Sequence, residues 1–155
     1  MTLVPAGPAH AAVLEALHAA CFDDGWPAGD FVRLLETPGC FALIAMVADE
    51  PAGLAVCRAA VDECELLTIG VIPEFRRRHL GFSLLNATFA TARGHGAVRY
   101  FLDVAEDNLA ACALYYSVGF AQVGRRPNYY RRAGAGVAAL VLALDLGPIE
   151  ESGQG

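Results

Sequence analysis

A short basic segment at residues 76–81 stands where the sequence could bind a phosphate. Pro73 ends an apolar run rich in β-branched residues, and a helical apolar pattern begins at Leu80, so the segment joins a strand to a helix. The first N–H groups of a helix carry partial positive charge, and arginines beside them add donors for phosphate oxygens. The segment therefore predicts a pyrophosphate site, although a solvated basic turn explains these residues alone equally well.

A second group of candidate residues lies further along the chain. Asn108 and Tyr115 are seven residues apart, so they would share one face of a helix. Asn108 is also a good helix N-cap, and Tyr115 or Tyr116 could simply be core aromatics. Gly119 fits the end of that helix, and Phe120 then enters a strand. Spacing alone leaves both a functional and a structural role open.

The hydrophobic pattern predicts the elements that position both groups. Helices are expected at 8–21, 26–37, 80–93 and 108–118, a hairpin turn at 49–53, and strands at 2–4, 40–47, 54–60, 65–72, 98–104, 120–125 and 137–144. The order β-α-α-β-β-β-α-β-α-β-β indicates an α/β (α+β) domain with a mixed, mostly antiparallel sheet of six to seven strands and about four helices. We expect a single domain at 1–146 and a flexible tail at 147–155.

Composition narrows the function classes. The 155 residues are 55% apolar and 18% charged, which excludes a mainly disordered chain. The formal charge of −6 argues against general nucleic-acid binding and suits an amine or a basic protein as partner. No apolar run reaches the roughly 18 residues of a membrane span, and no secretory signal is recognisable. Five cysteines without a CxxC spacing indicate thiols in a reducing cytoplasm, so no metal is expected.

Taken together, the two segments resemble the GNAT acetyltransferases. That family's phosphate loop reads Arg/Gln-x-x-Gly-x-Gly/Ala at the start of a helix, and a later element reads Asn-x-x-Ala-x-x-Leu-Tyr-x-x-x-Gly-Phe. The later element is matched at Asn108, Ala111, Leu114, Tyr115, Gly119 and Phe120. The resemblance covers residues 50–145 and is nearest to the RimI-like branch, which acetylates the N-terminal alanine of a small-subunit ribosomal protein. The runs at 26–27, 69–73, 102–104 and 125–130 favour this branch.

The resemblance implies acetyl-CoA as cosubstrate and the GNAT fold. In this family a bulge splays two neighbouring strands, and the pantetheine arm lies in the gap, hydrogen-bonded to strand backbone. The residues implied in binding it are Ile69, Gly70, Val71, Arg76, Arg77, Arg78, His79, Leu80, Gly81, Phe82, Asn108 and Tyr115. His79 occupies the first glycine position of the loop pattern. If the backbone there needs a positive φ, histidine is tolerated better than most residues.

The implied chemistry is direct transfer without a covalent acyl-enzyme, so a base must remove a proton from the attacking amine. Asp103 is the leading base, although this branch usually carries glutamate there, and Glu65 is the alternative; either could instead orient the substrate or be a surface charge. Tyr115 would donate a proton to the departing thiolate. Tyr129 and Tyr130 are candidates for the acceptor groove or for ordinary packing.

The sequence leaves alternatives open for the acceptor and for catalysis. The acidic side chains Asp23, Asp24 and Asp30 could attract a basic peptide or belong to a solvated loop. The acceptor could also be a small-molecule amine or a lysine side chain instead of a protein N-terminus. The departures at His79 and Asp103 leave open a non-catalytic acyl-CoA-binding module. The expected assembly is a monomer or a weak homodimer, with no nucleic-acid or membrane partner.

Overall fold

The computed structural model describes residues 1–132 and 135–147, and its elements follow the predicted order. The strands are β1 (Thr2–Ala6), β2 (Cys40–Val47), β3 (Glu50–Ala60), β4 (Glu63–Val71), β5 (Arg99–Ala105), β6 (Ala121–Arg132) and β7 (Ala135–Asp145). The α-helices are α1 (Ala11–Cys21), α2 (Ala28–Glu36), α3 (Leu80–Gly94) and α4 (Leu109–Val118), with 3-10 helices η1 (Pro8–His10) and η2 (Pro73–Phe75). Most of the tail predicted at 147–155 lies outside the described residues.

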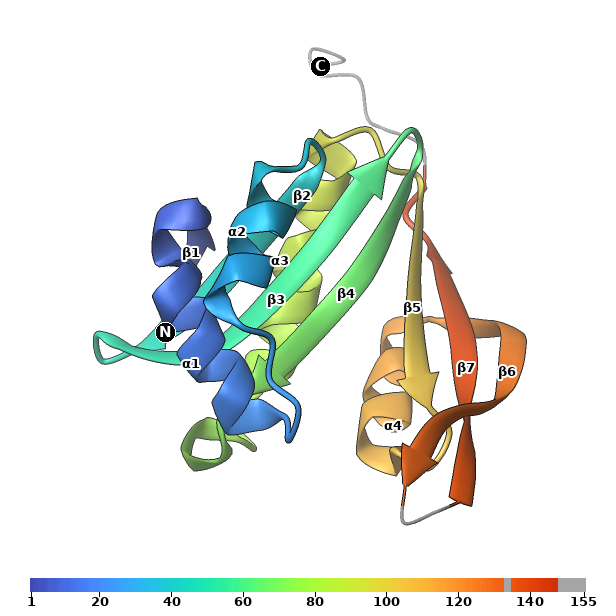
Figure 1. Cartoon of the computed structure of the whole chain (residues 1–155). Coiled ribbons are helices and arrows are strands. Elements are labelled where there is room, and N and C mark those ends of the chain that lie inside the picture. The colour runs from blue at the N-terminus through green and yellow to red at the C-terminus, as the bar shows by residue number, and fades with distance from the viewer. Residues whose placement is uncertain (133–134, 148–155) are drawn as a thin grey trace.

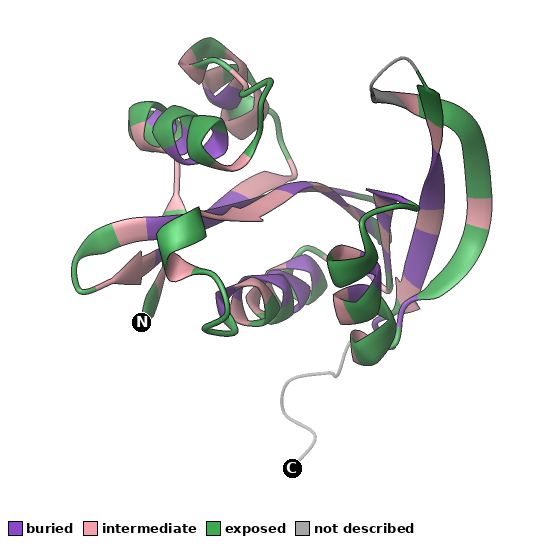
Figure 2. Cartoon of the chain, turned by 90° about the horizontal axis from the view of Figure 1, so that it is seen from below, coloured by how far each residue is buried: buried purple, intermediate pink, exposed green. Residues whose placement is uncertain are grey.

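One mixed sheet forms the middle layer of the molecule (Figure 1). Its strand order is β1-β2-β3-β4-β5-β7-β6, and β4–β5 is the parallel pair among antiparallel neighbours in the described chain. Helices α1 and α2 cover one face, and α3 and α4 cover the other; the β6–β7 pair bends toward the α1–α2 side (Figure 2). The predicted mixed, mostly antiparallel architecture is confirmed.

Alternating side chains of the central strand β3 divide the apolar interior into two cores. Leu54 and Val56 pack with residues of α1 and α2, whereas Ala55 and Cys57 pack with residues of α3. This is the period of two expected for a strand buried on both faces. Apolar cores therefore cover both faces of the sheet, one beneath α1 and α2 and the other against α3. Within the described residues, no helix is long and apolar enough to cross a membrane.

Two predicted boundaries were wrong. The turn between β2 and β3 is not at 49–53 but at Ala48 and Asp49, whose φ values of 50° and 66° are those of a tight hairpin. Strand β6 is twice its predicted length, because its irregular middle is accommodated by register shifts. Between Arg126 and Tyr130 the strand carries two more residues than its partner, and Asn128 there has φ of 56°. A bulge of this kind tolerates the proline that sequence rules read as a strand end.

Candidate active site

The site begins where β4 and β5 separate. The two strands pair over three rungs only, the last being Glu65 opposite Phe101, and then diverge (Figure 1). The remainder of β4, which includes Ile69, Gly70 and Val71, pairs with β3 on its other side. A strand with one open edge can hydrogen-bond an extended amide-containing ligand as if that ligand were another strand. The three residues predicted to bind pantetheine therefore lie along the gap.

A bulge in β4 accompanies this divergence. The register with β3 changes from Cys57 opposite Leu66 to Val56 opposite Thr68, so Leu67 is an extra residue on β4. An extra residue bends a strand and increases its twist. The bulge lies two residues beyond the last β4–β5 rung, which places the bend at the start of the gap.

The predicted phosphate loop lies at the open end of the gap and enters α3. His79 is the N-cap of α3 and has φ of 59° and ψ of 19°, so the backbone conformation there is the one that glycine adopts most easily. The first helical hydrogen bond of α3 runs from the Ser83 N–H to the His79 carbonyl, at 3.0 Å. The N–H groups of residues 80–82 precede it and have no intrahelical acceptor. This turn fits a pyrophosphate.

The arginine side chains of the loop are exposed and differently engaged. Arg76 donates its Nε–H to the Val71 carbonyl oxygen over 2.9 Å, which ties the loop to the end of β4. The Arg78 guanidinium lies 5.2 Å from the ring centroid of Phe75. Arg76 thus holds the loop in place, while the exposed guanidinium groups give this end of the gap the positive charge that a pyrophosphate requires.

Helix α4 begins after Asn108, which is its N-cap. The Asn108 side-chain oxygen accepts the Ala111 N–H at 3.2 Å, so the capping role considered for this residue is realised. Gly119 ends the helix with φ of 114°. Asn108 therefore fixes where the helix starts, whether or not it also contacts a ligand.

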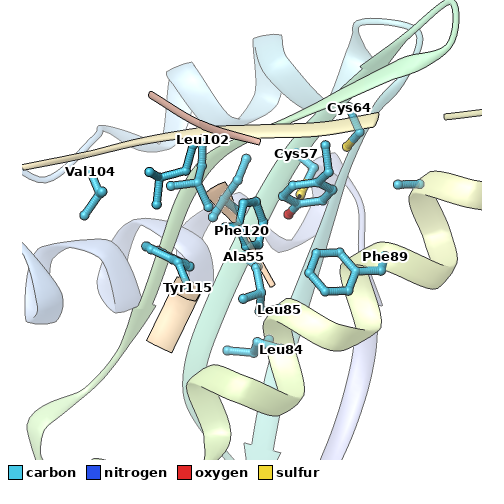
Figure 3. Packing of buried hydrophobic residues seen from close by; sticks show 14 of the residues in the cluster. Ala55, Cys57, Cys64, Leu84, Leu85, Phe89, Leu102, Val104, Tyr115 and Phe120 are labelled. Atoms are coloured by element: carbon cyan, nitrogen blue, oxygen red, sulfur yellow. Dashed lines mark hydrogen bonds between the residues drawn. The ribbon is translucent and has the colours of Figure 1, made fainter. Parts of the chain in front are cut away.

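Tyr115 is buried in the core between α4 and β5. Figure 3 shows its ring near Phe120, Leu102 and Val104, and its centroid lies 5.7 Å from that of Phe120. Burial, with smaller contributions from Cys112 and Tyr130, raises the pKa of Tyr115 to about 12. The phenol therefore keeps its proton at neutral pH. Its side chain is both a core aromatic and a possible donor.

The two candidate bases line one pocket at the closed end of the gap. The pocket has a volume of about 340 Å³, and Glu65, Asp103, Arg58 and Arg126 contribute to its wall. Arg58 donates to Glu65 over 3.0 Å, whereas the closest Arg126 nitrogen lies 3.6 Å from Asp103. Asp103 stands two residues beyond Phe101, where the strands have parted. Its carboxylate is therefore the less engaged of the two and the nearer to the gap.

The remaining predicted acceptor residues are on the surface. Tyr129 is half exposed, packs perpendicular to Tyr130 at 5.0 Å, and has the Arg126 guanidinium 5.6 Å from its ring centroid. Tyr129 thus lies within the β6 bulge and Tyr130 is the first paired residue after it, on the strand that carries Arg126. Of the acidic side chains, Asp30 pairs with Arg33 on α2, and Asp23 and Asp24 are exposed.

Sequence reasoning missed His18. Its side chain is 3% exposed and bonds both to Thr68 on β4 and to the backbone of Trp26. The available signal was a histidine on the apolar stripe of α1, four residues after Leu14. No set of three or more metal-ligating side chains converges within residues 1–132 and 135–147.

A comparison with known families identifies this arrangement. The acetyltransferase (GNAT) family matches residues 11–120. The chain belongs to this family. A stretch of 117 residues is 42% identical to the N-alpha-acetyltransferase RimI of Mycobacterium tuberculosis and covers 73% of this chain and 72% of that protein. Another match, to the [ribosomal protein bS18]-alanine N-acetyltransferase of Salmonella typhimurium, is 38% identical over 98 residues, 63% of this chain and 66% of that protein.

Solved GNAT structures share the fold. The crystal structure of the ribosomal-protein-S18-alanine N-acetyltransferase from Escherichia coli superposes with a TM-score of 0.86 at 25% identity, covering 99% of this chain and 97% of that one. Arabidopsis thaliana NAA60 in complex with acetyl-CoA superposes with a TM-score of 0.81 at 18% identity, covering 93% and 97%. The predicted GNAT acetyltransferase fold is confirmed, and the RimI-like resemblance is confirmed with it.

Proposed function

We propose that this GNAT chain transfers the acetyl group of acetyl-CoA to the α-amine of a protein N-terminus, with an N-terminal alanine of a ribosomal protein as the first candidate. The observation that carries the proposal is the gap between β4 and β5. Its open end meets the amides and arginines at the start of α3, and its closed end meets a pocket that contains Glu65 and Asp103. The N-alpha-acetyltransferase RimI of Mycobacterium tuberculosis and the [ribosomal protein bS18]-alanine N-acetyltransferase of Salmonella typhimurium support the proposal, because they are 42% and 38% identical to this chain over the matched residues.

Asp103 is the proposed base for the attacking amine. A protonated amine has no lone pair, so a proton must leave before the amine can attack the thioester carbonyl. An α-amine has a pKa of roughly 7.7–8.0, against about 10.4 for lysine, and is therefore easier to deprotonate near neutral pH. A water molecule could connect the short Asp103 side chain to the amine. Glu65, held by Arg58, would orient the ammonium group before it loses its proton.

Tyr115 is the proposed hydrogen-bond donor to the leaving sulfur. Burial raises its pKa to about 12, and this raised pKa limits the transfer of its proton. An ordinary thiol has a pKa of about 8.5, well below that of this buried phenol, so complete proton transfer from the phenol to a thiolate is unfavourable. A hydrogen bond from the phenol to the developing thiolate avoids this cost. Tyr115 therefore stabilises the departing charge while keeping its proton, which refines the role expected from the family resemblance.

The proposal extends to the setting of the reaction. Acting on a ribosomal protein would place the chain in the cytoplasm. Residues 1–146 would form a single acetyltransferase domain, and the protein would be a monomer or a weak homodimer. A peptide running from the pocket would pass Tyr129 and Tyr130, whose rings offer contact area at low entropic cost. These residues and the β6 bulge would then form one wall of the acceptor groove.

Mass spectrometry of peptides incubated with the protein and acetyl-CoA tests the proposal. An alanine-initiated ribosomal peptide should gain one acetyl group on its α-amine. The matched control is the same sequence with a blocked N-terminus and an internal lysine, which should remain unmodified. Acetylation of the lysine would move the assignment to a side-chain acceptor, and binding of acetyl-CoA without transfer to any amine would indicate a non-catalytic module.

A further inference from the structure

His18 is a buried, fully hydrogen-bonded side chain to which the proposed reaction gives no role. Its Nδ1 accepts the backbone N–H of Trp26 at 2.9 Å, and its Nε2 lies 3.1 Å from the Thr68 hydroxyl oxygen. Because Nδ1 accepts, the neutral ring carries its proton on Nε2 and donates it to Thr68. His18 therefore connects two segments that are distant in sequence, the loop before α2 and strand β4.

Thr68 lies at the β4 bulge, so its hydrogen bond with His18 is made at the bend of the strand. Leu66 and Ile69 pack in the core against α3, whereas Leu67 packs in the core beneath α1 and α2, and Thr68 also turns to that side to meet His18. Two consecutive side chains on one face are the consequence of the extra residue in a bulge. The His18–Thr68 hydrogen bond therefore forms at the point where β4 bends away from β5.

Aromatic and backbone contacts extend the connection in both directions. The His18 ring stacks on Trp26, with centroids 4.6 Å apart, and lies 4.5 Å from the ring of Phe22. Further along β4, a β-carbon added to Gly70 would lie 2.9 Å from Cβ and Sγ of Cys21. The end of α1 and the loop after it thus pack directly on the strand segment proposed to bind pantetheine.

The loop on the other side of His18 borders the proposed acceptor site. Trp26 and Arg58 line a second pocket, with a volume of about 460 Å³, and Arg58 also lines the pocket of Glu65 and Asp103. The two pockets are therefore neighbours that share one arginine. A change in the position of Trp26 would alter the wall of the region in which the acceptor is proposed to bind.

We propose that His18 is a positioning residue that couples the two substrates. Through Thr68 it fixes the bulge that shapes the cosubstrate gap, and through Trp26 it fixes the loop beside the acceptor pocket. CoA bound along β4 and a peptide bound beside Trp26 then each favour the same arrangement, so each strengthens the binding of the other. This inference rests on the proposed function, because that function places the acceptor at the pocket of Glu65 and Asp103, next to the pocket that Trp26 lines.

The chain offers a matched control for the test. Thr88 on α3 is also a buried threonine, and its hydroxyl lies 2.6 Å from the Leu85 carbonyl oxygen and 2.8 Å from the Tyr100 hydroxyl. Thr68→Val and Thr88→Val each remove one bonded hydroxyl at nearly constant volume, and both should lower the melting temperature. Thr68→Ser keeps the hydroxyl and serves as the rescue variant.

The measurement is calorimetric binding of CoA with and without an alanine-initiated peptide, a pair that cannot react. In the unchanged protein the peptide should tighten CoA binding. Thr68→Val should weaken CoA binding about fivefold, as expected for one lost hydrogen bond, and should reduce the effect of the peptide toward none. Thr68→Ser and Thr88→Val should retain the affinity and the coupling of the unchanged protein.

Two results would overturn the inference: equal losses of CoA affinity in Thr68→Val and Thr88→Val, or unchanged binding and coupling in Thr68→Val. Failure of the proposed function would look different. In that case no peptide is acetylated by the unchanged protein and none affects CoA binding, while Thr68→Val alone still weakens CoA binding. That pattern would remove the acceptor half of the inference and retain the positioning of the cosubstrate strand.

Discussion

Arg77 and His79 both have left-handed backbone conformations, with φ of 65° and 59°, in the turn that enters α3. Glycine adopts this conformation without steric cost, whereas a β-carbon there costs roughly 1–2 kcal/mol. The family pattern has glycine at the position of His79, so this chain keeps the glycine conformation with a different side chain. The proposed contact of the loop amides with a phosphate therefore depends on the backbone turn and not on the side chain of residue 79.

Replacing His79 with glycine should preserve CoA affinity. The His79 side chain makes no capping hydrogen bond, and the released strain is opposed by the extra chain entropy of glycine, so the melting temperature should stay the same or rise slightly. His79→Val is the contrasting variant, because a β-branched residue is strongly disfavoured at this φ and should lower both stability and affinity. Calorimetric titration with CoA checks both variants. A large loss of affinity in His79→Gly would show that the imidazole itself contacts the cosubstrate.

Replacing Tyr115 with phenylalanine should slow the reaction more than it weakens acetyl-CoA binding. The variant keeps the ring that packs in the core and removes the hydroxyl proposed to stabilise the thiolate. A hydrogen bond to a charged group contributes about 1.5–3 kcal/mol, so kcat should fall roughly 10- to 150-fold. Steady-state kinetics at saturating acetyl-CoA measure this effect. An unchanged kcat would remove Tyr115 from the chemistry and leave it as a core aromatic.

Replacing Asp103 with asparagine should reduce kcat/KM for the peptide while CoA affinity is retained. The carboxylate is proposed to accept the amine proton, and the amide of asparagine is a poor base of similar shape. Glu65→Gln is the matched variant in the same pocket. Because Glu65 is held by Arg58, its loss should act mainly on the KM of the peptide.

Asp103→Glu completes this comparison, since the longer side chain reaches further into the pocket. We expect it to retain or increase activity. If Glu65→Gln loses kcat while Asp103→Asn keeps it, the two carboxylates exchange roles, and Glu65 is the base.

The pH dependence of kcat/KM should report the class of acceptor. For a peptide α-amine the rate should rise about tenfold per pH unit and level off near pH 8, where the free amine predominates. For a lysine acceptor the rise should continue toward pH 10. Initial rates from pH 6 to 9.5, with CoA release as the readout, distinguish these cases, and a plateau already at pH 6 would contradict amine deprotonation as the controlling step.

Local patterns predicted the parts of the site that lie within single elements. The end of β4, the start of α3 at Leu80 and the capping of α4 by Asn108 and Gly119 follow from proline, periodicity and capping preferences. The splay between β4 and β5 was predicted from the family resemblance, because the sequence of a single strand does not determine which strand it pairs with. The bulge at Leu67 escaped local reasoning because it depends on the register of β4 with β3.

The same limit explains the boundaries that were wrong. Pro51 and Gly53 favour a turn locally, but the hairpin closes earlier, at Ala48 and Asp49, because the register of β2 with β3 aligns the apolar residues of both strands on their cores. Pro127 likewise favours a strand end, yet β6 continues past it because β7 pairs with the residues on both sides. In each case tertiary pairing overrode a local preference.

Acidification should destabilise the fold through His18. Burial lowers the pKa of His18 below its ordinary value of 6.5, since the ring is neutral and enclosed in the native state. Between the lowered native pKa and the unfolded value near 6.5, the unfolded chain binds more protons, so stability falls as the pH falls through this window. Above this pH window the neutral His18 ring makes its full contribution to stability. Below the native pKa of His18 this group adds no further pH dependence to the stability. Protonation of the His18 ring would also add a hydrogen to Nδ1. Nδ1 could then no longer accept the hydrogen bond from the backbone N–H of Trp26, and the two N–H groups would face each other.

Urea denaturation from pH 7.5 to 4.5 tests this expectation when the unchanged protein is compared with His18→Gln. The variant cannot titrate at this position, so the difference in unfolding free energy between the two proteins should favour the unchanged protein most above pH 6.5 and shrink on acidification. Other titrating groups contribute equally to both proteins and cancel in the difference. A difference that stays constant across the range would mean that burial does not lower the pKa of His18 in the folded protein.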